Sequence, residues 1–129
     1  MKKVFFIIFS VIIVVLVINF FIPKQEFQNI SPKEAYDLIL KEDVIILDVR
    51  TPGEFNSGHI VNAINIDYYN SSFKSELSKL DKNKTYIIYC RSGNRSGKTL
   101  DIMKELGFKN VYNISGGILS WNSYNLPLN

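Results

Sequence analysis

An apolar run occupies residues 4–22, interrupted only by the polar residues Ser10 and Asn19. A helix of that length reaches roughly 28 Å, about the hydrocarbon thickness of a bilayer. A secretory signal usually has a shorter apolar stretch of roughly 7–15 residues, followed by small residues at its cleavage site. This run ends instead in bulky side chains before Pro23. We therefore expect residues 1–23 to be an uncleaved signal anchor, with a cleaved signal or a buried helix of the following domain as the alternatives.

Charges beside this run predict its orientation. Lys2 and Lys3 precede it, whereas Lys24, offset by Glu26, is the nearest basic residue after it. Because positive charge favours the cytoplasmic side, the domain should face away from the cytoplasm, and it would be secreted or periplasmic if the segment is cleaved. Residues 24–29 then form a short polar tether to a domain at residues 30–129.

Helical and strand-like patterns alternate through that domain. Two capping boxes with Pro at the first helical position, beginning at Ser31 and Thr51, predict a helix at residues 32–41 and one short helical turn. The continuous apolar runs at residues 44–47 and 86–89 are typical of strands buried on both faces of a parallel sheet. Further predicted elements are short strands at 63–66 and 111–114, a helix-like face at 71–80, a helix at 96–106 closed by Gly107, and a turn at Gly116 and Gly117 leading to Trp121. The alternation predicts an α/β fold with a mainly parallel central sheet and helices on both faces.

Composition narrows the possible functions. The residues after the apolar run carry 13 basic and 12 acidic side chains, a balance that does not favour nucleic-acid binding. Roughly 100 residues suffice for one core and one domain. The single cysteine, Cys90, excludes an internal disulfide, and Cys90 and His59 alone are too few ligands for structural zinc. We expect neither a metal nor another cofactor.

The candidate site is the segment Cys90-Arg91-Ser92-Gly93-Asn94-Arg95-Ser96, between a predicted buried strand and a predicted helix. This position is the carboxyl edge of the sheet, where open α/β folds bind ligands. A loop rich in Gly, Ser and Asn can turn its backbone N–H groups inward, and the helix behind it adds the positive end of its dipole. In such surroundings the pKa of a cysteine falls from ~8.5 to ~3.5–7.5. A buried structural cysteine is the alternative, but the two arginines and the glycine that follow Cys90 favour a reactive thiolate.

This segment resembles the active-site loop of rhodanese-like sulfurtransferases, and three other segments resemble motifs of that family in the same order. They are the Asp-x-Arg motif at residues 47–55, the Gly-His-Ile turn at residues 58–63 and the closing turn at residues 116–121. The resemblance extends over residues 30–121 and does not include the apolar segment.

The resemblance implies that Cys90 takes sulfane sulfur from a donor such as thiosulfate and holds it as a persulfide. A thiol or cyanide would then accept the sulfur, and a protein acceptor stays open. The implied cradle for the persulfide and the anionic donor consists of Arg91, Ser92, Gly93, Asn94, Arg95 and Ser96, with the two arginines on the oxyanion end of the donor.

Four other residues have a structural and a functional interpretation. Asp48 and Arg50 are expected to form an ion pair that shapes loops, rather than to act in acid–base catalysis. His59 is expected to bond backbone groups within a turn, rather than to form a dyad with Cys90. Trp121 is expected to pack in the core, rather than to contact substrate.

Two other functions compete with sulfur transfer. A phosphatase or arsenate reductase also uses a thiolate in an anion-binding loop, but its loop has five residues between Cys and Arg, whereas four separate Cys90 from Arg95. A noncatalytic or redox-sensing binding module is the second alternative. Such modules often lose the cysteine, which this chain retains.

Overall fold

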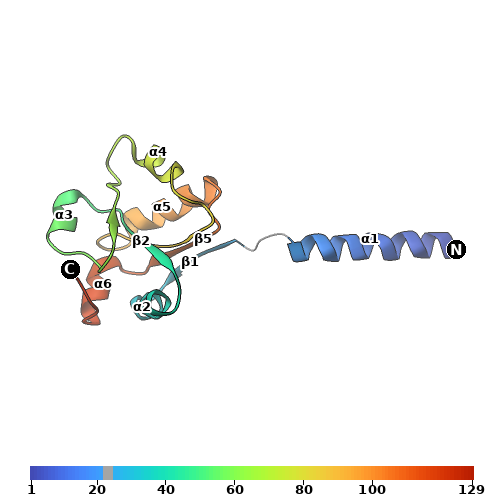
Figure 1. Cartoon of the computed structure of the whole chain (residues 1–129), viewed down its shortest axis with the longest axis horizontal. Coiled ribbons are helices and arrows are strands. Elements are labelled where there is room, and N and C mark those ends of the chain that lie inside the picture. Colours follow the sequence, from blue (N-terminus) through green and yellow to red (C-terminus); the bar gives the residue numbers. More distant parts are fainter. Residues whose placement is uncertain (22–24) are drawn as a thin grey trace.

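The computed structural model describes residues 1–21 and 25–129, except for the side chains of Asn19 and Phe21. Residues 22–24, where the predicted apolar segment ends and the predicted tether begins, lie outside the described residues. The elements in chain order are α1 (Lys2–Phe21), β1 (Glu26–Ile30), α2 (Pro32–Lys41), β2 (Val44–Asp48), α3 (Pro52–Asn56), β3 (Ile64–Asn65), α4 (Phe73–Ser78), β4 (Thr85–Tyr89), α5 (Asn94–Glu105), β5 (Asn110–Ile114) and α6 (Gly117–Ser123) (Figure 1).

The strands form one sheet in the order β1-β5-β4-β2-β3, and every pairing between neighbours is parallel. Strand β4 lies in the middle, between β5 and β2. Its residues from Tyr86 to Tyr89 are buried, as a strand covered on both faces requires. The predicted α/β fold with a parallel sheet is confirmed, and the end of β4 delivers Cys90 to the centre of the sheet's carboxyl edge.

Successive side chains of β4 enter two separate cores. Tyr86 and Ile88 pack with α4 and α5 on one face, through residues such as Leu77 and Met103. On the other face Ile87 and Tyr89 pack with α2 and α6, through Ala35, Ile118 and Trp121. The predicted cover of helices on both faces is therefore confirmed.

Both predicted capping boxes are present. At the start of α2, the backbone N–H of Ser31 donates to Glu34 at 2.7 Å, and the N–H of Glu34 donates to Ser31 Oγ at 3.1 Å. Thr51 and Glu54 form the same reciprocal pair at the start of α3. The second box fixes where the chain turns beside the cysteine loop, residues 90–96.

Several boundaries differ from those predicted. Residues 26–29, which we expected in a tether, form strand β1 with Ile30 and pair in parallel with β5 along the edge of the sheet. The tether interpretation is wrong for these residues. Their polar side chains resemble those of a linker, but their backbone forms hydrogen bonds with β5. Helix α5 begins at Asn94 rather than at residue 96. The turn at Gly116 opens a further helix, α6.

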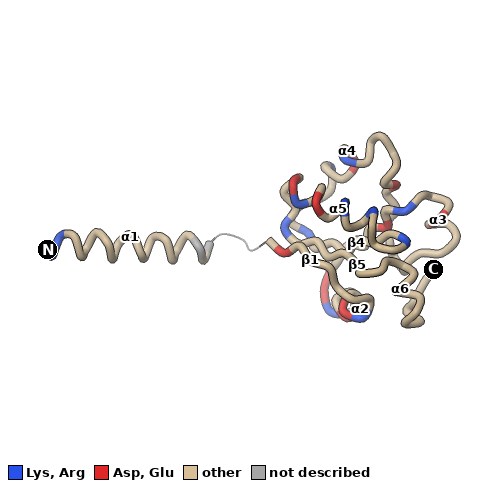
Figure 2. Tube along the Cα trace, turned by 180° about the vertical axis from the view of Figure 1, so that it is seen from behind, with Lys and Arg blue, Asp and Glu red and all other residues tan. Residues whose placement is uncertain are grey.

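Helix α1 precedes the sheet and carries its only charged side chains, Lys2 and Lys3, at its start (Figure 2). Its large apolar side chains from Val4 to Ile18 are exposed. Among residues 1–21 and 25–129, no helix meets both the length and the hydropathy needed to cross a membrane. The predicted membrane segment therefore has no support from the described residues and stays a prediction.

Candidate active site

Cys90 directly follows β4 and is 1% exposed. Its sulfur accepts hydrogen bonds from the backbone N–H of Gly93 at 3.1 Å and from the hydroxyl of Ser96 at 3.3 Å. Ser96 lies in the first turn of α5 and is itself buried. The loop thus folds back on its own cysteine and aims donors at the sulfur.

These donors determine the acidity of the thiol. Burial raises the pKa of Cys90, but hydrogen bonds from the hydroxyl and backbone of Ser96, and from the backbone N–H groups of Gly93 and Ser92, outweigh it and lower the pKa below its ordinary value. Gly93 adopts φ +102°, a conformation that glycine reaches without strain. The site therefore favours a thiolate, the nucleophilic form of cysteine.

The glycine turn before α6 closes the loop from the other side. The N–H of Ile118 donates to the carbonyl of Cys90 at 2.9 Å, and the N–H of Leu119 donates to the carbonyl of Arg91 at 3.2 Å. This contact requires glycine at position 117, because an added Cβ would lie 2.5 Å from the carbonyl oxygen of either residue. The start of α6 is thus bonded to the backbone that carries the nucleophile.

Arg95 occupies a position different from the one expected for an anion ligand. Its guanidinium donates two hydrogen bonds to the carboxylate of Glu54, a bidentate contact at 2.8 and 3.0 Å, and lies over the ring of Tyr69. The hydrogen bonds from Arg95 lower the pKa of Glu54 from 4.5 to about 2, although burial opposes the change, and they raise the pKa of Arg95. The arginine therefore ties α5 to the cap of α3, and its charge is already compensated.

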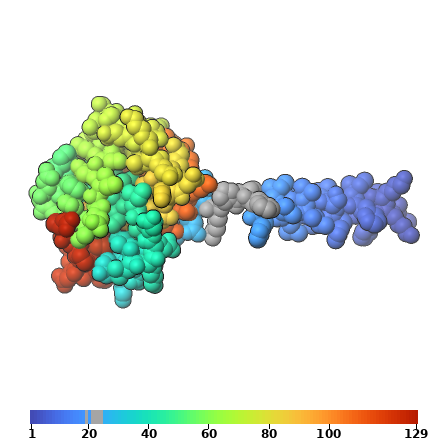
Figure 3. Space-filling view, viewed as in Figure 1, coloured from blue at the N-terminus to red at the C-terminus, as the bar shows by residue number. Residues whose placement is uncertain are grey.

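Arg91, unlike Arg95, is unpaired within the described residues. Its side chain is exposed, and it forms no ion pair with any residue that the structure describes. It lines a cavity of about 530 Å³ between the cysteine loop, the α3 segment, α6 and the C-terminal residues. Figure 3 shows these C-terminal residues against the segment around α3, where Ile60 and Leu128 form an isolated bridge.

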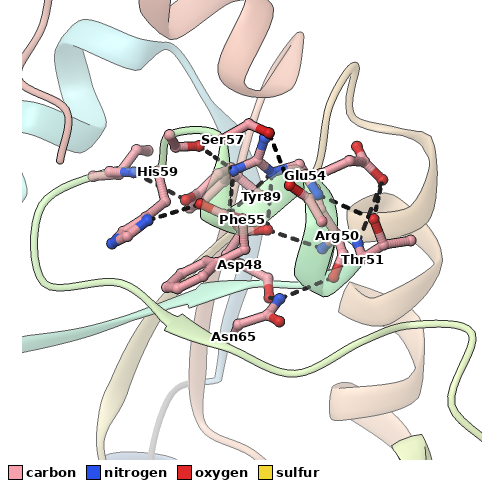
Figure 4. A network of polar contacts seen from close by, with 12 residues as sticks. Asp48, Arg50, Thr51, Glu54, Phe55, Ser57, His59, Asn65 and Tyr89 are labelled. Carbon is pink, nitrogen blue, oxygen red and sulfur yellow. Dashed lines mark hydrogen bonds and ion pairs between the residues drawn. The ribbon is translucent and has the colours of Figure 1, made fainter.

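Asp48 and Arg50 form a buried ion pair beside the loop (Figure 4). The guanidinium donates to both carboxylate oxygens of Asp48 at 2.7–3.0 Å and to the carbonyl of Gly58 at 2.7 Å. The amide of Asn65 donates to the carbonyls of Asp48 and Arg50, and the hydroxyl of Tyr89 accepts the backbone N–H of Ile60. The network connects the chain from β2 to β3, and the expected role of the pair in shaping loops stays a prediction.

His59 contacts groups other than the sulfur. Its Nδ1 lies 2.9 Å from the carbonyl of Phe55, and its ring stacks on the Phe55 ring at 3.7 Å between centroids. Its backbone exchanges two hydrogen bonds with Asn129.

The indole of Trp121 is buried and donates to the carbonyl of Pro127. Within the described part of the chain, no three Cys, His, Asp or Glu side chains converge as a metal site.

Sequence reasoning missed two parts of this site. The sequence places Glu54 in the capping box that begins at Thr51 and in the Asp-x-Arg motif, but its partner Arg95 is 41 residues away and no local pattern connects the two. Tyr89 was identified only as part of a buried strand. A buried tyrosine needs a polar partner for its hydroxyl, so the predicted burial of Tyr89 could have indicated that this hydroxyl forms a hydrogen bond.

Comparisons with known proteins give a consistent result. A family model described as a rhodanese-like domain matches residues 31–124. The chain is 35% identical over 98 residues to the thiosulfate sulfurtransferase GlpE of Coxiella burnetii, a match covering 76% of this chain and 90% of the relative. It is 34% identical to a sulfurtransferase of Allochromatium vinosum, over 67% of this chain and 79% of the relative. The solved structure of a rhodanese-related protein from Thermoplasma volcanium matches with a TM-score of 0.71 and 31% identity, over 80% of this chain and 98% of that protein.

Proposed function

This chain belongs to the rhodanese-like domain family, and we propose that it is a sulfurtransferase that carries sulfane sulfur on Cys90 as a persulfide. The donor is an anionic sulfur compound such as thiosulfate, and the acceptor is thiophilic. The observation that carries the proposal is the buried sulfur of the chain's single cysteine, bonded by Gly93 and Ser96 and having a lowered pKa. Two relatives named as sulfurtransferases support it.

The loading step follows from a thiolate at this position. The Cys90 thiolate attacks the outer sulfur of thiosulfate and forms a new S–S bond. The S–S bond within thiosulfate breaks, and its electron pair leaves with sulfite. The charge of the thiolate passes to the terminal sulfur of the persulfide, where inward-facing N–H groups of the cysteine loop can stabilise it.

The transfer step reverses this pattern at the same sulfur. An acceptor thiolate or cyanide attacks the terminal sulfur, and the electron pair of the broken S–S bond returns to Cys90 as a thiolate. A hydrogen-bond donor that stabilises the Cys90 thiolate makes Cys90 a better leaving group. The hydrogen bonds that lower its pKa thus serve both half-reactions.

The competing functions have less support. A phosphatase needs an arginine that is free to bind a tetrahedral oxyanion, but Arg95 is paired with Glu54 and follows Cys90 after four residues. A noncatalytic binding module has no need of sulfur-directed donors at Cys90.

Turnover of thiosulfate and cyanide by the full-length protein tests the proposal. We expect sulfite and thiocyanate in equal amounts, and no product from the variant Cys90→Ser. Thiocyanate production by the folded Cys90→Ser variant, or none by the wild type, would contradict it.

We also propose that residues 4–22 anchor the domain on the extracytoplasmic side of a membrane, on the support of the apolar run and of Lys2 and Lys3 before it. Protease added to intact cells stripped of any outer barrier should then degrade the domain. Protection until the cells are lysed would reverse the topology.

A further inference from the structure

Arg95 carries its charge close to the reacting sulfur. It precedes Ser96, whose hydroxyl donates to the sulfur of Cys90 at 3.3 Å, and both residues lie in the first turn of α5. Hydrogen bonds to Glu54 raise the pKa of Arg95 most, and attraction to the charge on Cys90 raises it further. The charge on this guanidinium therefore acts on the sulfur and on an anion that approaches it.

The carboxylate of Glu54 compensates this charge. Its two oxygens accept hydrogen bonds from the guanidinium of Arg95 at 2.8 and 3.0 Å. Thr51 holds the carboxylate in place, because its hydroxyl donates to Glu54 at 3.1 Å within the capping box of α3 (Figure 4). Water reaches only part of the pair, since 15% of the Arg95 side chain and 30% of the Glu54 side chain are exposed. The pair thus presents no net charge to the cysteine loop.

The two capping boxes separate this role of Glu54 from capping itself. Glu34 has the same position in the box of α2 and makes the same reciprocal hydrogen bonds with Ser31. Glu34 forms no ion pair with the residues that the structure describes. Capping a helix therefore does not require an arginine partner, and the bidentate contact with Arg95 is an additional property of Glu54.

The compensation of Arg95 matters because the loading step brings like charges together. Cys90 reacts as a thiolate, and thiosulfate carries two negative charges. Positive charge beside the sulfur reduces their repulsion, and this benefit grows with the charge of the donor. When Glu54 neutralises Arg95, a doubly charged donor loses more of the benefit than a singly charged donor does.

We infer that Glu54 is a specificity-determining residue for the sulfur donor: by neutralising Arg95 it shifts the preference of the site from doubly charged toward singly charged sulfane-sulfur anions. The inference rests on the proposed sulfurtransferase function. One singly charged donor is an organic thiosulfonate, R–SO₂–S⁻. The Cys90 thiolate attacks its outer sulfur and forms the S–S bond of the persulfide. The S–S bond of the donor breaks, and its electron pair leaves with the sulfinate, R–SO₂⁻.

The test compares two donors that differ by one negative charge. Full-length protein is given either thiosulfate, a dianion, or methanethiosulfonate, a monoanion, with cyanide as the common acceptor. Thiocyanate formation gives kcat/KM for each donor at one pH and low salt. The observable is the ratio of the two values, thiosulfate over methanethiosulfonate. A change in the amount or reactivity of the Cys90 thiolate affects both donors and cancels in this ratio.

The two partners of the ion pair are changed one at a time and then together. Glu54→Gln keeps a residue that suits a capping box but leaves the charge of Arg95 uncompensated, so the ratio should rise. Arg95→Gln leaves the carboxylate of Glu54 uncompensated, so the ratio should fall. Each change should be roughly twofold to fivefold, as expected for one pair of partly exposed charges, and added salt should reduce it. The double variant should return to the wild-type ratio.

Glu34→Gln is the matched control, because it makes the same change at the same position of the other capping box. It should keep the wild-type ratio. Opposite changes in the two single variants, with wild-type ratios in the double variant and the control, support the inference. A pair that only holds the loop in place would give the same result when either partner is lost. Unchanged ratios, or changes in one direction in both folded single variants, therefore overturn the inference.

Glu54→Gln decides the case alone if Arg95→Gln does not fold. A higher ratio that salt reduces then supports the inference, and an unchanged or lower ratio overturns it. Failure of the wild type to transfer sulfur from either donor is a distinguishable result, because it would reject the proposed function and the inference with it.

Discussion

The acidity of Cys90 should depend on the hydroxyl of Ser96. Ser96→Ala removes the donor 3.3 Å from the sulfur and leaves the backbone donor Gly93 at 3.1 Å in place. Hydrogen bonds to charged groups contribute ~1.5–3 kcal/mol. Because sulfur is a weak acceptor, we take a value of about 1–1.5 kcal/mol, which is roughly fivefold to tenfold in the thiolate fraction below the pKa.

Alkylation by iodoacetamide measures this fraction, since the thiolate is the reacting form. The rate of the wild type should rise with pH through a lowered pKa. The Ser96→Ala curve should lie at higher pH, with a rate roughly fivefold to tenfold lower on the rising limb and a similar rate on the plateau. Ser92→Ala is the matched control, because Ser92 contributes its backbone to the sulfur and its side chain is exposed. Superimposable Ser96→Ala and wild-type curves would refute this account of the thiolate.

Three stability predictions follow from other contacts of the site, each measured by urea unfolding. Gly117→Ala should cost about 1–3 kcal/mol, because its Cβ would meet carbonyl oxygens of the cysteine loop at 2.5 Å, while Gly53→Ala, with open space around it, should not destabilise; equal effects would contradict the packing argument. Asp48→Asn should cost about 3–5 kcal/mol because it leaves the charge of Arg50 buried without its carboxylate, and a loss below about 1 kcal/mol would show that the pair is dispensable. Glu54→Gln should cost about 1 kcal/mol at neutral pH, a value reduced for solvent exposure. The carboxylate of Glu54 has a lowered pKa, so the difference in unfolding free energy between the wild type and Glu54→Gln should reach its full value above pH 4.5 and vanish as the pH falls toward about 2. A difference independent of pH would refute the ionic origin.

Local patterns predict the centre of this fold because they are complete within a few residues. The capping boxes at Ser31 and Thr51 contain both partners of each reciprocal hydrogen bond. The buried run of β4 identifies a central strand through its apolar side chains alone. Strand β1 lacks such a pattern, because it is an edge strand with exposed Gln28 and Asn29, and its pairing partner β5 is far away in the sequence.

The same distinction applies to the site. The cysteine loop is predictable because its glycine, serines and nucleophile are adjacent, and the backbone between them supplies the donors. The state of each arginine is not predictable in this way. Arg95 and Arg91 are near neighbours in the loop, yet Arg95 is paired with Glu54 and Arg91 is not paired among the described residues. That difference depends on the tertiary position of α3, which no local pattern contains.

Intact mass spectrometry of the full-length protein after treatment with thiosulfate tests the central claim most directly. We expect the intact protein to gain the mass of one sulfur atom and to lose it when cyanide is added. Digestion should place the added mass on the peptide that contains Cys90. The folded variant Cys90→Ser should show no gain, because the chain has no other thiol. A wild-type protein that keeps its original mass, or a sulfur adduct that persists in Cys90→Ser, would contradict persulfide chemistry at this site.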